Sequence, residues 1–250
     1  MDRYSKIKSI GYIGEEGFKK IQNARVLILG AGGIGTNTIV NLVSMGVGHI
    51  GLVDNDVVEM KNLSIQTLYN EESIGRYKVD VVKEWVEKYN PHIDFKTYNL
   101  RLDENNYEDI FKDYDIIANA FDTQKSVHLV NKLAVKTNKP IVFTGSHELE
   151  GSILTVIPGK TPCFDCYIER QLKVAEKEYG VTQATGAIVA GLQSAEILKI
   201  ILDMGIAIHT NPLAFNMLLG LIERPRIYTS KTRKCEVCGR PLISYAPFYN

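Results

Sequence analysis

One short segment limits the fold of this chain more than any other: the glycine-rich turn Gly30-Ala-Gly-Gly-Ile-Gly35, which stands between two apolar runs. The run that ends in it, residues 25–30, is continuous and aliphatic, as buried parallel strands are. The run that follows, Ile34 to Met45, has apolar residues at helical spacing, and a second strand is expected from His49 to Val53. Strand, glycine turn, helix and strand together predict a βαβ unit.

The same alternation of strands and helices continues to about residue 145. We expect a helix from Ser73 to Tyr89, with Ser73 as its N-cap, and another from Lys125 to Thr137. Strands are expected at three places: Ile93–Tyr98, Asp115–Ala118 and Ile141–Thr144. These elements predict an α/β fold with a doubly wound, mainly parallel, Rossmann-like sheet over residues 20–145.

The pattern changes beyond residue 145. A strand at Gly151–Ile157 is followed by a long apolar helix, Ala184–Met204, and then by two short strands. This order predicts a C-terminal antiparallel extension of the sheet. Because no repeat, low-complexity tract or linker divides the chain, we expect a single domain over residues 1–250. Its core covers about 20–145, and its second part, about 146–250, carries all the cysteines.

Charge and composition exclude several classes of protein. The 250 residues include 29 Lys+Arg and 29 Asp+Glu, so the basic excess of proteins that bind nucleic acids or membrane surfaces is absent. The first residues hold no apolar stretch of a secretory signal. The apolar stretch from Ile197 to Ile208 contains Lys199 and Asp203, which indicates a buried helix and not a membrane span. We therefore expect no nucleic-acid or membrane partner, and a cytoplasmic location.

The glycine turn predicts a phosphate site. The spacing Gly30-x-Gly32-x-x-Gly35 lets the backbone turn tightly and brings the first N–H groups of a helix to an anion. Asp54 directly follows the second strand, where a carboxylate can accept hydrogen bonds from ribose hydroxyls. Both NAD and ATP fit these features, and a turn kept only for packing is the alternative.

Three further features favour ATP over NAD. Polar residues are dense after the second strand, where a NAD enzyme needs a single acid: Asp54, Asp56, Asn62 and Gln66. Lys78 is placed to neutralise phosphate charge. Asp122 follows a strand of the sheet, and a carboxylate at this edge suits Mg²⁺, which takes one or two protein oxygens. Each residue alone could be a solvated surface group, so the prediction depends on their joint placement.

All four cysteines fall in two C-x-x-C pairs, Cys163 with Cys166 and Cys235 with Cys238. Two such pairs can complete a tetrahedral thiolate shell around zinc, which would staple two distant parts of the chain. A redox pair or plain buried thiols are the alternatives. Four thiolates leave no open position on the metal, so the zinc would be structural. No cysteine would then remain as a nucleophile for a covalent intermediate.

The sequence resembles the MoeB/ThiF/HesA family, the bacterial and archaeal relatives of ubiquitin-activating enzymes, over nearly its whole length. The motifs that carry the resemblance run from Arg3-Tyr-Ser-Lys6 through Gly30-Ala-Gly-Gly-Ile-Gly35, Gly46-Val-Gly48, Asp54-Asn-Asp56, Asn62-Leu63, Gln66, Gly75-Arg-Tyr-Lys78, Asn90-Pro91, Asp122 and both cysteine pairs. The resemblance implies a homodimer that adenylates a carboxylate with MgATP and releases pyrophosphate.

The resemblance also implies roles for single residues. Gly30, Gly32, Gly33 and Gly35 would face the phosphates, and Asp54, with Asp56 beside it, would hold the ribose end of the nucleotide. Asn62, Gln66 and Lys78 would contact phosphate, Asp122 would hold magnesium, and Lys6 would reach across the dimer. The carboxylate is already ionised, so the protein would mainly align reactants and neutralise charge.

Two departures from the family pattern concern phosphate binding. Ile65 stands where the family has an arginine before the glutamine, and Lys6 stands where it has an N-terminal arginine. A lysine offers a point charge in place of a planar fork of donors. We expect Lys61 or Arg76 to compensate. The cysteine that some members carry before the long helix is absent from Glu178–Gln183.

Several functions stay open at this stage. The substrate is expected to be the C-terminal glycine of a ubiquitin-like sulfur carrier protein, or else a small-molecule or peptide carboxylate. Relatives of the second kind include microcin-maturation enzymes and the one that adenylates the pyridinol carboxylate of the iron-guanylylpyridinol cofactor. A non-catalytic nucleotide-binding module is a remote alternative. His147, Glu148 and Glu150 could select the substrate or belong to a solvated loop. The segment Glu169–Tyr179 could cover the substrate tail or form a plain surface helix, and the aromatic tail Pro241–Asn250 could pack on the body or on a partner.

Overall fold

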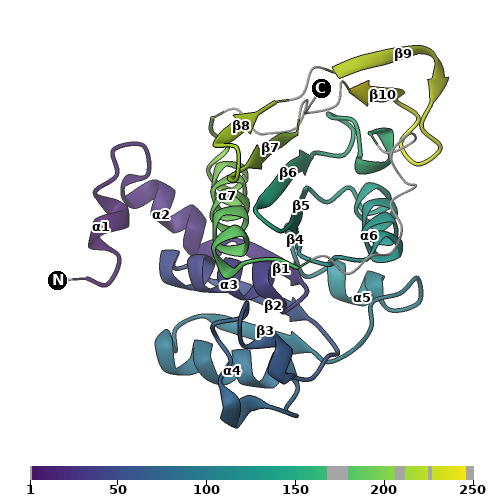
Figure 1. The fold of residues 1–250 in the computed structure, drawn as a ribbon. Coiled ribbons are helices and arrows are strands. Elements are labelled where there is room, and N and C mark those ends of the chain that lie inside the picture. The colour runs from purple at the N-terminus through teal and green to yellow at the C-terminus, as the bar shows by residue number, and fades with distance from the viewer. Residues whose placement is uncertain (1, 168–179, 206–211, 225–226, 246–250) are drawn as a thin grey trace.

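A computed structural model describes residues 2–167, 180–205, 212–224 and 227–245. Its centre is an eight-stranded sheet with the order β3-β2-β1-β4-β5-β6-β7-β8 (Figure 1). The strands are β1 (Arg25–Leu29), β2 (His49–Val53), β3 (Asp94–Tyr98), β4 (Ile116–Asn119), β5 (Ile141–His147), β6 (Glu150–Val156), β7 (Leu213–Asn216) and β8 (Leu221–Glu223). The first five pair in parallel and the last three antiparallel, which confirms the predicted mainly parallel sheet with its antiparallel extension.

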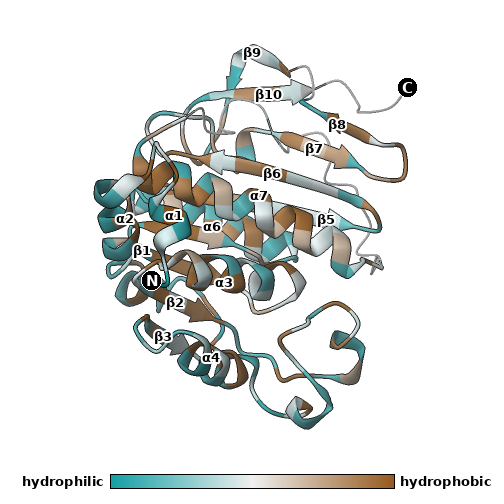
Figure 2. Cartoon of the chain, turned by 90° about the vertical axis from the view of Figure 1, so that its left-hand side faces the viewer, coloured by the Kyte–Doolittle hydropathy of each residue, from teal (hydrophilic) through white to brown (hydrophobic). Residues whose placement is uncertain are grey.

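The sheet is doubly wound, with helices over both faces. One apolar core joins it to α2 (Gly14–Asn23), α3 (Gly33–Met45), α4 (Lys78–Tyr89) and α7 (Gln183–Leu202). A second core joins the other face to α5 (Tyr107–Phe111) and α6 (Gln124–Lys136). In Figure 2, β2 is drawn in brown and α2 mainly in teal, as expected for a buried strand and an outer helix. Burial on both faces explains why β1 is aliphatic from Val26 to Leu29.

Helix α7 is the one described element that is long and apolar enough to cross a membrane by length and composition. Half of its apolar window is buried against the rest of the chain, where it packs on α3, β5 and β6. It also carries buried polar side chains, Gln193 and Glu196, and Thr155 of β6 donates a hydrogen bond of 2.6 Å to Glu196. Packing inside the fold therefore accounts for its apolar composition.

Two predicted boundaries were wrong by three residues or more. Helix α4 begins at Lys78 and not at Ser73, because Ser73 closes the 3-10 turn Glu71–Ser73 in a reciprocal capping box with Asn70. Gly75, with φ of +83°, then turns the chain before α4 can start. Strand β5 continues three residues beyond the predicted Thr144, because β6 pairs with it along its whole length to His147.

The chain closes with a separate two-stranded antiparallel sheet, β9 (Ile227–Lys234) and β10 (Pro241–Tyr245). It carries the second cysteine pair in the turn between its strands and reaches the short 3-10 helix Phe164–Cys166. This hairpin pairs with neither edge of the main sheet. The predicted zinc site would therefore connect the hairpin to the part of the chain that carries the first cysteine pair.

Candidate functional site

The glycine turn between β1 and α3 leaves no room for a side chain at Gly30 or Gly35. Gly30 has φ of +102°, and a Cβ on it would lie 2.9 Å from the carbonyl oxygen of Ala120. A Cβ on Gly35 would lie 1.9 Å from the carbonyl oxygen of Gly30. The backbone of the turn is thus packed against itself and against the end of β4. This close approach leaves the first N–H groups of α3 at the carboxyl edge of the sheet, where an anion can bind.

Replacing Gly33 by alanine tests this packing. Its new Cβ would lie 3.0 Å from the carbonyl oxygen of Ile65, a backbone atom that cannot rotate away. We expect the free energy of unfolding in urea to fall by about 1–3 kcal/mol, the usual cost of overpacking. Gly191→Ala is the matched control: it lies inside α7, with no heavy atom of the described chain within 4 Å of the new Cβ. That variant should gain about 1 kcal/mol from helix propensity, and equal effects of the two changes would contradict the account.

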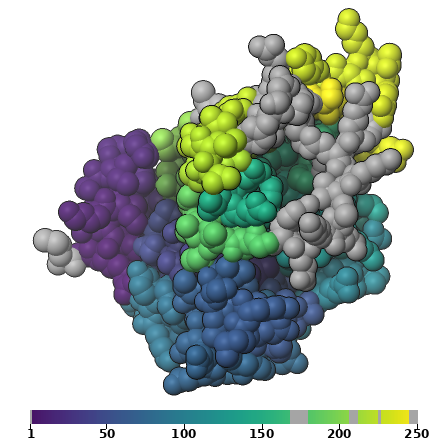
Figure 3. All heavy atoms as spheres, viewed as in Figure 1, coloured from purple at the N-terminus to yellow at the C-terminus, as the bar shows by residue number. Residues whose placement is uncertain are grey.

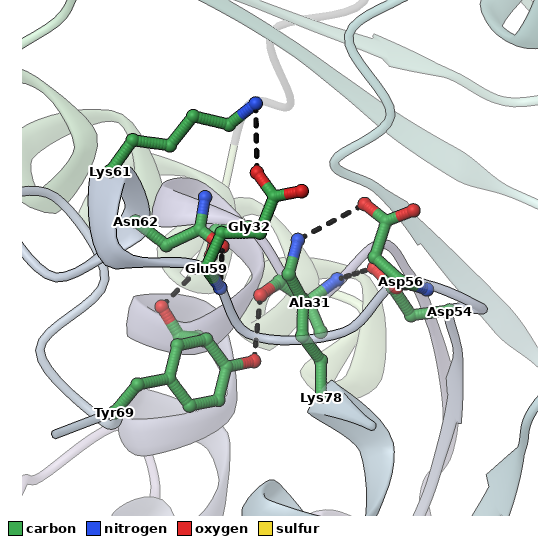
Figure 4. A network of polar contacts seen from close by, with 10 residues as sticks. Ala31, Gly32, Asp54, Asp56, Glu59, Lys61, Asn62, Tyr69 and Lys78 are labelled. Atoms are coloured by element: carbon green, nitrogen blue, oxygen red, sulfur yellow. Dashed lines mark hydrogen bonds and ion pairs between the residues drawn. The ribbon is translucent and has the colours of Figure 1, made fainter. Parts of the chain in front are cut away.

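Asp54 ties the second strand to the glycine turn (Figure 4). One carboxylate oxygen accepts the N–H of Ala31 at 2.7 Å, and the other accepts the N–H of Asp56 at 2.8 Å. Tyr69 holds the same turn from another side, since its hydroxyl donates to the carbonyl oxygen of Ala31 at 2.8 Å. Burial raises the pKa of the Asp54 carboxyl, although these two N–H donors and the charge of Lys78 oppose the shift. The turn is therefore held in shape by the residue predicted to hold the ribose.

Lys78 supplies a cation beside these acids. It is the first residue of α4, its side chain is 7% exposed, and its ammonium lies 3.1 Å from the carboxylate of Asp56. Asp56 itself is largely exposed. A buried ammonium with an acid at its outer side can turn toward phosphate once a nucleotide is bound.

Asn62 and Gln66 lie on the loop that passes over the glycine turn. Both are buried, and the Asn62 carboxamide accepts the N–H of Glu59 at 2.9 Å. Gln66 comes near Gly32, since its Nε2 lies 3.9 Å from where a Cβ on Gly32 would be. The buried Oε1 of Gln66 has no hydrogen-bond partner among the described residues.

Asp122 lies at the same edge of the sheet. Strand β4 pairs with β1 up to Asn119 opposite Leu29, so the segments that follow both strands emerge side by side. Asp122 is exposed and directly precedes Thr123, which caps α6 by accepting the N–H of Ser126. The structure thus places Asp122 and the glycine turn at the ends of adjacent strands, as the sequence predicted.

Lys6 lies away from this group within its own chain. It belongs to α1 (Ser5–Lys8), whose neighbour Tyr4 packs on Gly46, at the C-terminal end of α3. The glycine turn is at the other end of this 13-residue helix, a span of about 20 Å at 1.5 Å per residue. In Figure 3 the N-terminal segment, in purple, forms one margin of the molecule. Within its own chain, Lys6 therefore lies far from the glycine turn.

Both cations expected to compensate for Ile65, Lys61 and Arg76, pair with acids. Lys61 directly precedes Asn62 and pairs with Glu59 at 2.8 Å (Figure 4). Arg76 instead bonds with both guanidinium ends to Glu84 on α4. Its fork of donors is thus committed to a surface partner.

A polar network behind the site was missed in the sequence. The Gln193 side chain on α7 donates to the carbonyl oxygens of Asn119 at 3.0 Å and of Val142 at 2.9 Å, and it accepts from Thr38 at 2.8 Å. It thereby joins the ends of β4 and β5 to α3. A glutamine inside an apolar helix is the signal that could have indicated it, because such a group needs buried partners.

The hairpin between β5 and β6 holds the three polar residues proposed to contact substrate. His147 lies 3.0 Å from Glu150, and Glu148 occupies the left-handed region with φ of +48°. The N–H of Glu148 bonds to the carbonyl oxygen of Gly180 at 2.6 Å, which brings the start of α7 next to the hairpin. The segment Glu169–Tyr179 lies outside the described residues, and so do residues 246–250 of the C-terminal tail.

The four cysteines form one cluster, although 72 residues separate the pairs. Their sulfurs lie within 4.8 Å of one another, with contacts of 3.8 Å, 3.7 Å and 3.3 Å. A tetrahedral zinc–thiolate site with bonds of about 2.3 Å has sulfurs about 3.8 Å apart, so the residues fit zinc. A hydrogen bond from Cys166 lowers the pKa of Cys163 to about 5, with smaller help from Asn131. The hydrogen bond with Cys163 raises the pKa of Cys166, and burial raises that of Cys235. The cluster thus favours a thiolate at Cys163, the form that binds metal.

Comparison with known proteins places the chain in a family. A model described as the ThiF family matches residues 4–237. The chain is 31% identical to the sulfur carrier protein adenylyltransferase of Thermus thermophilus, over 99% of this chain and 96% of that protein. It is 35% identical to the adenylyltransferase and sulfurtransferase UBA4 of Saccharomyces cerevisiae, over 91% of this chain. The chain therefore belongs to the ThiF family, and it spans 53% of the length of UBA4.

Solved structures agree with this assignment. MccB from E. coli with ATP superposes with a TM-score of 0.81 and 27% identity, covering 95% of this chain and 74% of that one. MccB with AMPCPP and MccA gives the same TM-score at 28% identity. The parallel core and its antiparallel extension are thus shared with an enzyme crystallised with ATP.

Proposed function

We propose that this chain is an ATP-dependent adenylyltransferase that activates a carboxylate as an acyl adenylate and releases pyrophosphate. The observation that carries the proposal is the tie between Asp54 and the glycine turn, with the ammonium of Lys78 beside it. It joins a phosphate-binding backbone, a ribose acceptor and a phosphate cation in one group. Membership of the ThiF family supports the same activity.

The reaction needs alignment and charge neutralisation more than proton transfer. An oxygen of the ionised substrate carboxylate attacks the α-phosphorus, and the bond to the β-phosphate bridging oxygen breaks to release pyrophosphate. The N–H groups at the start of α3 would hold phosphate oxygens. Asn62 and Gln66 would donate hydrogen bonds to phosphate, and Lys78 would neutralise charge on the leaving group. Charge held in place before reaction needs no rearrangement in the transition state.

Asp122 would hold a magnesium ion on the phosphates. Its carboxylate is exposed and lies at the carboxyl edge of the sheet, next to the glycine turn. Mg²⁺ keeps several waters and takes one or two carboxylate oxygens, so an exposed acid suits it. When bound, the ion supplies charge neutralisation at the phosphates.

The site would be completed in a homodimer by Lys6 of the other copy. Lys6 is exposed at the end of α3 that lies away from its own glycine turn. With Ile65 in place of the expected arginine, a second cation near the phosphates would come from Lys61, from Arg76 or from a partner subunit. The reduced cysteine cluster suits a cytoplasmic location.

The substrate would be the C-terminal glycine of a ubiquitin-like sulfur carrier protein, as the name of the Thermus thermophilus relative suggests. A peptide or small-molecule carboxylate is the second candidate, favoured by the similarity to MccB, which was crystallised with MccA. A non-catalytic nucleotide-binding module is the third.

Carboxylate-dependent ATP–pyrophosphate exchange separates these candidates. The protein would be given ATP, labelled pyrophosphate and, in turn, carrier proteins that end in glycine, peptides and small carboxylic acids. Exchange with a carrier alone supports the first candidate, and exchange with a peptide or small acid alone supports the second. Binding of ATP without exchange for any member of the panel would overturn the enzymatic proposal.

A further inference from the structure

Asn131 on α6 contacts the cysteine cluster at two points. It is fully buried, and its Nδ2 donates to the sulfur of Cys163 at 3.4 Å. Its Oδ1 accepts the N–H of Phe164 at 3.0 Å. A carboxamide has one donating end and one accepting end, so these two bonds fix its orientation. Asn131 therefore connects α6 both to a metal-binding sulfur and to the backbone between the two cysteines.

A second residue of α6 supports this contact. His128 lies three residues earlier, on the same face of the helix, and bonds to the carboxylate of Asp165. Its ring also meets the ring of Phe164 edge-on, with 6.1 Å between centroids. Phe164 packs in turn on Phe143 of β5 at 4.8 Å. The segment Cys163–Cys166 thus packs against α6, and Asn131 makes buried hydrogen bonds in that contact.

We propose that Asn131 is a positioning residue for the metal, which orients the Cys163 thiolate and makes the order of α6 depend on zinc. An N–H donated to sulfur stabilises the thiolate that zinc binds, and outer groups of this kind usually change metal affinity by about 10–100-fold. Helix α6 starts directly after Asp122 and Thr123. Through Asn131, helix α6 therefore connects the cysteine cluster to the edge of the sheet where the nucleotide would bind. This role of Asn131 does not depend on the proposed reaction.

The first test is zinc affinity, measured by competition with a chromophoric chelator. Asn131→Asp keeps the size and the acceptor for Phe164 but turns a carboxylate oxygen toward sulfur. Asn131→Ala removes both bonds without adding charge. We expect the zinc dissociation constant to rise about 10–100-fold in both variants. Gln124→Glu is the matched control, because it makes the same amide-to-acid change at an exposed position of α6 and should leave zinc affinity unchanged.

The second test is amide hydrogen exchange in the α6 peptide, with zinc bound and after chelation. In the unchanged chain, zinc removal should speed exchange across α6, and in Asn131→Ala this response should be lost. Circular dichroism would show whether Asn131→Asp folds. If it does not, the zinc affinity of Asn131→Ala and the hydrogen-exchange data would test the role of Asn131. The proposal would be overturned if both variants bound zinc within twofold of the affinity of the unchanged chain. It would also be overturned if the exchange rate of α6 amides were the same with and without zinc.

Discussion

Asp122→Ala should lower carboxylate-dependent ATP–pyrophosphate exchange by about 10²–10³-fold, the usual cost of removing one preorganised charge-stabilising group. The exposed carboxylate follows β4 at the edge where the glycine turn leaves β1. Without it, the charge that magnesium supplies at the phosphates would be poorly placed. The fold should be retained, because the cap of α6 is the side chain of Thr123 and not of Asp122.

The control for this prediction is Asp109→Ala. Asp109 is also exposed and pairs with Lys112 on the surface of α5 at 2.7 Å, a contact of small energetic value. Exchange rates and thermal unfolding would be measured on both variants. An exchange rate for Asp122→Ala within twofold of that of the unchanged protein would remove Asp122 from the mechanism. A lower exchange rate together with a lower unfolding temperature would show a structural role instead.

Cys166→Ser should release the zinc and lower the unfolding temperature by roughly 10 °C. Cys166 is fully buried, and its sulfur contacts those of Cys163 and Cys238. Metal binding that requires the folded cluster adds directly to folding free energy, and each kcal/mol shifts the midpoint by about 2–4 °C in a chain of this size. Scanning calorimetry with and without chelator, together with metal analysis, would measure the effect.

Chelation provides the internal control for this second prediction. The unchanged protein should lose stability when zinc is removed. Its unfolding temperature should then be close to that of the Cys166→Ser variant in chelator. Because the cluster offers four sulfurs to one metal, no thioester to a cysteine should form during turnover. An unfolding temperature of the unchanged protein that chelator does not alter would contradict a structural metal.

The sequence was sufficient where local pattern decides structure. Strand β2 was predicted to the residue, because a short apolar run before an acid is a local signal. The start of α4 was predicted five residues early, because Ser73 caps a 3-10 turn with Asn70 and not the helix. The extra length of β5 comes from pairing with β6, a tertiary contact that strand propensity does not encode.

The candidate site divides in the same way. The positions of Asp54 and Lys78 at the edge of the sheet could be predicted, because Asp54 follows β2 and Lys78 begins α4 there. The contacts that shape the site could not, because Tyr69 reaches Ala31 from a loop and Gln193 reaches Thr38 across 155 residues. Spacing indicates which residues share an edge, whereas partners far apart in sequence depend on how the helices pack.

The most direct test of the account follows the oxygen atoms of the substrate. A carboxylate that supports exchange would be labelled with ¹⁸O and incubated with the protein, ATP and hydroxylamine, which attacks the acyl carbon. If the carboxylate attacks the α-phosphorus, the AMP released should carry one ¹⁸O atom, measured by mass spectrometry, and the pyrophosphate none. Label in inorganic phosphate, with ADP as the other product, would show attack at the γ-phosphorus and contradict the proposed adenylation.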